Sequence, residues 1–249
     1  TLVAISIVTL SPEPGIALEE IARIGVSRPM LVPLEFAVVL ACVPYLDRHW
    51  LRAQPGMETV PDGELHNALA EHFLTMARGL YAETKRDYPD AAAVLVCHQG
   101  LRGAEMNDTQ LALLGDRQTL VDTRALADVG FEAVVAGHYH RHQVVLPGGE
   151  HSGTGVVLYA GSIERVDWGE ATERKGFIVA DVEPGRFEWE FVETPARRFV
   201  TLTGDQWAND YDVAAAHVRD AVVRVLDLDP AIDAAEVRRD LEALGAFEV

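Results

Sequence analysis

The chain has 249 residues, of which 49% are hydrophobic and 24% are charged, so it is long enough for one large domain or for one domain and a small one. Its 21 lysines and arginines against 39 acidic residues give a formal net charge of −18, which disfavours autonomous DNA binding, because cationic side chains supply most phosphate contacts. No window approaches the length of a membrane span and the start of the chain has no signal-peptide pattern, so we expect a cytoplasmic protein that does not enter a membrane.

The first part of the chain is predicted to form strands. Residues 2–7 are apolar and strand-like, and a Ser-Pro turn at residues 11–15 separates them from a short predicted helix at residues 17–24. The apolar stretch at residues 29–44 predicts two antiparallel strands, the second at residues 36–43, both in the core of a sheet.

A long amphipathic helix is predicted at residues 64–85, where apolar residues repeat three and four positions apart. These residues are Leu65, Leu69, Phe73, Met76 and Leu80. The pattern indicates packing, and we expect no site on this helix.

Two short apolar strands each end beside histidines. Residues 92–97 precede His98, and residues 131–136 precede a Gly-His-x-His element that contains His138 and His140. Sites in α/β folds collect at the carboxyl ends of strands, so we expect the two segments to share an edge. Side chains two apart in extended backbone point the same way, so His138 and His140 are expected to reach one cavity. Neutral imidazole binds zinc, manganese or iron, so the pattern predicts a hydrolytic metal centre; a polar loop rich in histidine is the alternative.

The two cysteines, Cys42 and Cys97, both lie in apolar strand-like segments, so we expect buried free thiols in a reducing compartment. Cys97 adjoins His98 and is a further candidate ligand, although alternation along the strand would turn it to the opposite face.

The connection at residues 101–120 is longer than usual and follows a strand that ends on a candidate ligand. It is either a lid or substrate loop, or a surface excursion with one helical turn. Farther along, strand patterns and Gly-Gly and Pro-Gly turns predict a late β meander. Its strands are expected at residues 143–146, 156–159, 176–182 and 187–192.

The composition changes after residue 194, where a strand opening at residues 197–199 is followed by two helical patterns. The first pattern is marked by Val218, Val222 and Leu226. The second begins with a capping box at Asp233 and ends at Gly245.

The most specific segment is residues 159–170, Tyr-Ala-Gly-Ser-Ile-Glu-Arg-Val-Asp-Trp-Gly-Glu, followed by Lys-Gly-Phe at residues 175–177. It has no general physical signature. Together with the two histidine elements, it resembles the SbcD-type nuclease subunits of bacterial SbcC/SbcD complexes, within the calcineurin-like metallophosphoesterases. The resemblance runs from residue 2 to about residue 200 and is strongest at residues 91–177.

The resemblance implies an α/β fold in which two sheets form a sandwich flanked by helices, followed by a small α+β capping domain. The nuclease domain would occupy residues 1–193 and the capping domain residues 194–249. It also implies a site with two divalent metal ions, usually manganese.

By the same resemblance, His98 and His138 are ligands of one ion and His140 is a ligand of the other. The residues expected near the substrate are His142, Gly161 and Ser162. For His142, which is outside the ligand pattern, a simple surface position is the alternative.

The chain departs from the family pattern at residues 7–10, where Ile-Val-Thr-Leu stands in place of Gly-Asn-His-Asp. In the family, that asparagine binds metal and that histidine acts on the substrate phosphate. Two earlier motifs, Asp-x-His and Gly-Asp, are expected before this point and are missing from the sequence. We therefore expect an amino-terminally incomplete nuclease domain with no intact catalytic residue, and whether the capping domain is complete stays open.

The function implied is that of a subunit of a nuclease that processes DNA double-strand breaks by metal-dependent phosphodiester hydrolysis, with impaired activity in this chain. The expected partners are an SbcC-type ATPase subunit, DNA ends and a second copy of the chain in a homodimer. Two alternatives are a non-catalytic scaffold subunit for the ATPase and a phosphoesterase for small phosphorylated substrates. The latter would share the Gly-His-x-His element but not residues 161–170.

Overall fold

The computed structural model describes residues 2–5, 30–34, 38–56, 58–114, 118–148, 155–209 and 211–249. The segment at residues 7–10, the predicted turn at 11–15 and the predicted helix at 17–24 lie outside the described residues. The chain forms a mixed α/β structure with two compact units. The first unit is Thr1–Ile163 with Arg174–Glu193, and the second is Glu164–Glu173 with Thr194–Val249.

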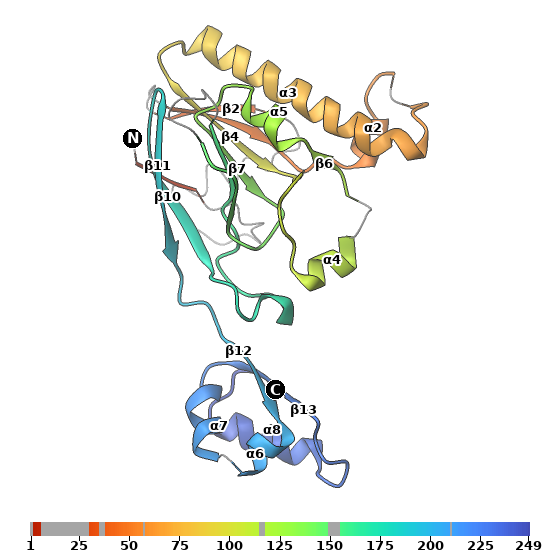
Figure 1. Cartoon of the computed structure of the whole chain (residues 1–249), viewed down its shortest axis with the longest axis vertical. Helices are drawn as coiled ribbons and strands as arrows, with labels where there is room; N and C mark the ends of the chain where they lie inside the picture. The colour runs from red at the N-terminus through yellow and green to blue at the C-terminus, as the bar shows by residue number, and fades with distance from the viewer. Residues whose placement is uncertain are drawn as a thin grey trace. The chain divides into compact units, whose positions relative to one another are not determined.

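The largest sheet of the first unit has six strands in the order β2-β3-β4-β7-β9-β8. Three of them, β2, β4 and β7, are labelled in Figure 1. The strands are β2 Met30–Leu34, β3 Val38–Val43, β4 Ala92–His98, β7 Ala133–Gly137, β8 Gln143–Leu146 and β9 Val156–Tyr159. The four central strands are parallel, while β2 and β8 pair antiparallel at the edges. The antiparallel pair predicted at residues 29–44 is confirmed, and among the described strands β2 lies at an edge of the sheet. An edge position suits β2 because it contains a proline, which lacks the N–H of a ladder donor.

A second, antiparallel sheet has the order β1-β10-β11. Its strands are β1 Leu2–Ile5, β10 Gly176–Glu183 and β11 Arg186–Glu193. The prediction of one late meander is wrong, because β8 and β9 belong to the first sheet and β10 and β11 to the second. The burial patterns agree with this division. Every residue of β9 is buried, as in a central parallel strand, whereas buried residues of β10 alternate with half-buried or exposed ones.

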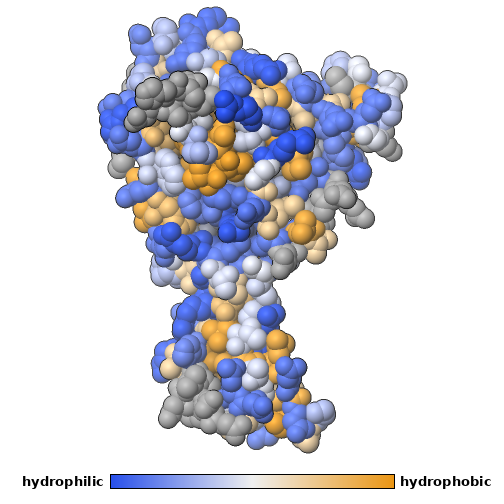
Figure 2. Space-filling view, in the orientation of Figure 1, coloured by the Kyte–Doolittle hydropathy of each residue, from blue (hydrophilic) through white to orange (hydrophobic). Residues whose placement is uncertain are grey.

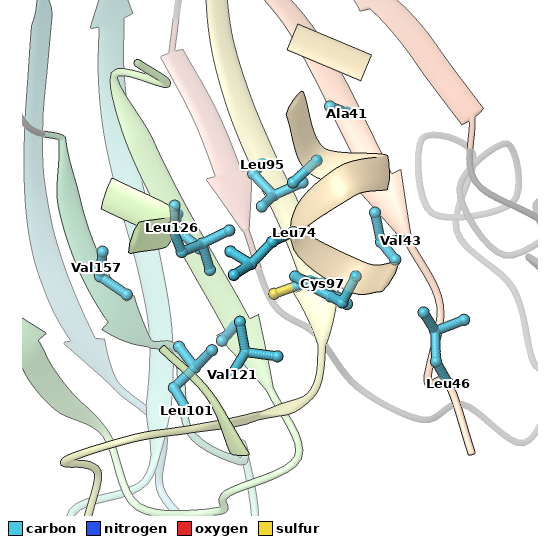
Figure 3. Packing of buried hydrophobic residues seen from close by; sticks show 14 of the residues in the cluster. Ala41, Val43, Leu46, Leu74, Leu95, Cys97, Leu101, Val121, Leu126 and Val157 are labelled. Carbon is cyan, nitrogen blue, oxygen red and sulfur yellow. The ribbon is translucent and has the colours of Figure 1, made fainter. Parts of the chain in front are cut away.

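The six-stranded sheet is packed on both faces. Val94 and Val135 face the second sheet and join Ile178 of β10 in one apolar cluster. Their neighbours along the strands, such as Leu95 and Val134, belong to another cluster with the helix α3, Leu65–Asp87. Figure 3 shows Leu74 of this helix among Val43, Leu95 and Cys97 of the sheet. The first unit is therefore a sandwich of two sheets with helices on the outer face of the larger one.

The helix α3, Leu65–Asp87, confirms the predicted amphipathic helix and buries Leu65, Leu69, Phe73 and Leu80. The shorter elements of the first unit are α2 Arg48–Arg52, η1 Asp62–Glu64, β5 Gly100–Leu101, α4 Asp108–Leu114, β6 Leu120–Val121 and α5 Thr123–Ala127. The elements β5 and β6 pair with each other, and α4 lies between them in the chain. The long connection after β4 is thus partly regular structure.

The second unit contains a parallel pair, β12 Phe199–Thr203 and β13 Val222–Leu226, and a 3-10 turn, η3 Trp168–Glu170. Its helices are α6 Gly204–Asn209, α7 Tyr211–Val218 and α8 Ala234–Ala243. The helix predicted through Val222 and Leu226 is wrong, because α7 ends at Val218 and the valine-rich segment that follows forms β13. The second predicted helix is confirmed: the Asp233 carboxylate accepts a hydrogen bond from Ala235 N at 2.9 Å, and Gly245 has a φ of +94°.

Residues 164–173 were assigned by sequence to the first domain, whereas the structure groups them with the second unit. Arg165 explains this, because its guanidinium donates hydrogen bonds to the carbonyl oxygens of Ala196 and Arg197 at 3.1 and 3.0 Å. The ring of Trp168 also packs edge-on against Phe199, with centroids 5.0 Å apart.

Among the described residues, none of the helices combines the length and apolar character needed to cross a bilayer. On the face of the molecule in Figure 2, hydrophobic patches are separated by hydrophilic residues.

Candidate metal centre

The predicted site residue His98 is the last residue of β4 and lies opposite Gly137, the last residue of β7, in the parallel register. The two strands therefore end at the same edge of the sheet, as the sequence analysis expected. His98 is half-buried there.

His138 lies just beyond the end of β7 in a left-handed backbone conformation, with a φ of +103°. The expectation that His138 and His140 share one face of an extended strand is wrong for this reason. The next residue, Tyr139, is buried in the cluster on the α3 side, where its ring stacks on Tyr159 with centroids 4.8 Å apart. The turn at His138 brings its ring to His98, with centroids 5.3 Å apart and planes at 67°.

The backbone of His140 is held by residues 159–170 and 175–177, the segment that has no general physical signature in the sequence. The carbonyl oxygen of His140 accepts hydrogen bonds from Ser162 N at 3.0 Å and from Lys175 Nζ at 3.2 Å. Lys175 is buried and also donates to Ser162 Oγ at 2.9 Å. Ser162 and Lys175 thus fix the loop that carries the histidines.

Gly161 allows its segment to approach the backbone of His140 and His142 closely. Its φ is +80°, and a Cβ atom at this position would lie 2.8 Å from His142 N and 3.1 Å from the His140 carbonyl oxygen. Only glycine fits without a shift, because both the conformation and the space exclude a side chain. Gly161 and Ser162, which were expected near the substrate, therefore contact the histidine loop itself.

The imidazoles of His98 and His138 are neutral at pH 7. Burial, followed by the nearby His98 and His140, lowers the pKa of His138 to about 4. Burial and then His140 lower the pKa of His98. His140 is close enough to affect both rings, and neutral imidazole is the form that binds transition metals.

A metal ion fits one feature of this edge well. The Nε2 atom of His138 is buried, and among the described residues it has no hydrogen-bond partner. A buried, unpartnered nitrogen beside a second imidazole is a ready ligand. However, no three or more histidine, cysteine, aspartate and glutamate side chains form a complete metal-binding group in the part of the chain that the structure describes. The described residues at this edge are therefore candidate ligands that do not form a complete set.

The positions of two of the other sequence candidates are explained by packing or hydrogen bonding. Cys97 is buried on the α3 side of the sheet, opposite to His98 as alternation predicted, and burial raises its pKa to about 12, so the thiol stays protonated. His142 accepts or donates a hydrogen bond at 2.8 Å between its Nδ1 and the Tyr159 carbonyl oxygen, and its ring stacks on Phe191 with centroids 4.2 Å apart.

Sequence reasoning missed Gln110, which lies in the long connection after β4. Its buried side chain donates from Nε2 to the His138 carbonyl oxygen at 3.1 Å, and its backbone N–H donates to the Asn107 side chain at 2.7 Å. The described part of this connection therefore supports the left-handed backbone of His138. The sequence contains no specific signal for this contact, apart from the place of Gln110 in a long connection after a strand that ends on a candidate ligand.

Tyr45 was missed as well. It follows β3 by two residues, and its ring lies 5.3 Å from that of His138 and 5.9 Å from that of His98. The signal in the sequence was its position just after the strand β3, as His98 and His138 lie at the ends of β4 and β7.

Comparison with protein-family models gives no match to the chain, and comparison with curated proteins gives none either.

Proposed function

We propose that the chain is a subunit of a DNA-processing nuclease of the SbcD type, in which the edge formed by β4 and β7 is part of a divalent metal centre. The observation that carries the proposal is the pair of neutral imidazoles, His98 and His138, at adjacent carboxyl ends of parallel strands, one of them with a buried and unpartnered Nε2. The support of the His140 loop by Ser162 and Lys175 gives the family-like segment a matching physical role.

The proposed roles follow from these contacts. His98 and His138 would hold one ion and His140 a second, both manganese. Bound divalent ions supply Lewis acidity and activate water for attack on a phosphodiester. The desolvated rings of His98 and His138 stay unprotonated and keep their lone pairs available at neutral pH.

The same proposal includes low activity for this chain. The residues expected to complete the ligand set and to act on the phosphate are replaced by Ile-Val-Thr-Leu at residues 7–10. An SbcC-type ATPase, DNA ends and a second copy of the chain are the proposed partners. The first unit would be a metallophosphoesterase-type domain and the second a capping domain.

A restoration experiment tests this proposal. The chain is assayed with manganese on linear duplex and single-stranded DNA, beside a variant that carries Gly-Asn-His-Asp at residues 7–10 and the two earlier family motifs ahead of residue 1. We expect little hydrolysis by the first and clear hydrolysis by the second, lost again on His138→Ala. Activity in the unchanged chain that survives His138→Ala, or an inactive restored variant that is folded and binds manganese, would contradict the proposal.

A non-catalytic scaffold subunit is the second candidate. The observation that favours it is the lack of a group of three or more potential ligands among the described residues. A restored variant that binds DNA and an ATPase partner but never hydrolyses DNA would support this function instead.

A further inference from the structure

An aromatic side chain covers the imidazole pair of the candidate centre. Tyr45 follows β3 at the edge where β4 ends in His98, because the two strands are parallel. Its ring is stacked on His138, with planes at 27°, and stands edge-on to His98, with planes at 89°. Two rings therefore fix the orientation of Tyr45.

Tyr45 is nevertheless 46% exposed. Part of the aromatic ring of Tyr45 thus stays in water directly beside the candidate centre, although the ring stacks on His138.

We propose that Tyr45 is a stacking platform for an unpaired nucleobase next to the phosphate that enters the site. The inference rests on the proposed function and deepens it, because it assigns a preference for single-stranded or frayed DNA over paired duplex. A paired base has its faces covered by its neighbours, whereas an unpaired base can stack on an aromatic ring whatever its sequence.

The charge of the chain strengthens this assignment. With a formal net charge of −18, the protein gains little from general attraction to the DNA backbone. A base contact at the site would then carry a large share of the binding to single strands.

The test compares two oligonucleotides with equal numbers of phosphates, an oligothymidylate and an abasic strand. Binding to the unmodified chain is measured by fluorescence anisotropy with manganese at low salt. We expect the oligothymidylate to bind about tenfold more tightly, the size typical of one stacked base. Tyr45→Ala should abolish this difference, and Tyr45→Phe should retain it.

Tyr88→Ala is the matched control, because Tyr88 follows α3 and precedes β4, at the opposite edge of the same sheet. It should leave the difference unchanged. A tenfold preference that persists in Tyr45→Ala would overturn the inference, and so would equal binding of both strands by the unmodified chain, which leaves the proposed function standing. Failure to bind either strand would also overturn the inference.

Discussion

The ends of β4 and β7 deliver their histidines in different ways. His98 belongs to a regular strand, and its position follows from the parallel register. His138 lies outside its strand with a φ of +103° and is supported by Gln110, while Ser162 and Lys175 hold the next turn of the loop. Left-handed backbone costs free energy for a residue with a Cβ, so it persists only where the surroundings over-determine it. The difference teaches that the position of one candidate ligand depends on the strand alone, and that of the other on residues distant in sequence.

The largest effect is expected where the histidine loop meets Gly161. Gly161→Ala should lower the free energy of unfolding by about 1–3 kcal/mol more than Gly185→Ala, because the added Cβ is overpacked against backbone atoms. Gly185 is a matched control, since its φ of +77° is nearly the same and nothing lies within 4 Å of an added Cβ. Urea unfolding of both variants measures the difference, and equal losses would show that the contact with His140 and His142 is not tight.

An effect of similar size is expected at Lys175, whose side chain supports the histidine loop. Lys175→Met removes a buried donor to the His140 carbonyl oxygen and to Ser162, which should cost about 2–3 kcal/mol. Lys85→Met is the comparison, because Lys85 also donates to a backbone carbonyl, that of Ala91, but from a partly exposed position. Thermal unfolding should show the greater loss of stability for Lys175→Met. A greater loss for Lys85→Met would show that Lys175 is not a main support of the histidine loop.

A smaller change still is expected at Gln110. Gln110→Met keeps the length of the side chain but removes the donor to the His138 carbonyl oxygen, so manganese affinity should fall about tenfold, as for other residues that orient ligands. Gln54→Met, which removes a similar bond to the Trp50 carbonyl oxygen on α2, should leave the affinity unchanged. Isothermal titration with manganese measures both, and unchanged affinity in Gln110→Met would show that the strand end holds His138 without help.

The smallest effect at neutral pH concerns protonation in the metal-free protein. The folded pKa of His138, about 4, lies below the ordinary value of 6.5, so the unfolded chain binds this proton more tightly. Its contribution to stability is therefore complete above pH 6.5 and is lost as the pH falls from 6.5 to 4. Urea unfolding at pH 7 and pH 5 should show a greater loss for the unmodified chain than for His138→Asn, in which asparagine tolerates the left-handed backbone. An equal loss of stability in both proteins would show that a group other than His138 takes up the proton.

The features that the sequence predicted are those set by local periodicity. The spacing from Leu65 to Leu80 predicted α3, and the apolar runs before His98 and His138 predicted β4 and β7. Periodicity misled at Val218, Val222 and Leu226, where a spacing of four suggested a helix although the β-branched residues between them favour a strand.

The arrangement of the site could be predicted only in part. The shared edge for His98 and His138 followed from strand ends, but the left-handed backbone at His138 depends on the burial of Tyr139 and on Gln110, which lies 28 positions earlier. The contacts of Lys175 likewise join segments far apart in the chain. Such contacts leave no local pattern, so no window of sequence contains them.

The central claim, that His98 and His138 face a common metal position, is tested most directly by manganese-induced broadening of histidine ring signals in NMR spectra. The chain has nine histidines, among which His66 and His72 on α3 are internal controls. At substoichiometric manganese, we predict that the signals of His98, His138 and His140 disappear first and together, while those of His66 and His72 stay sharp. A sharp His98 signal when that of His138 has vanished, or equal broadening of all nine, would contradict the claim.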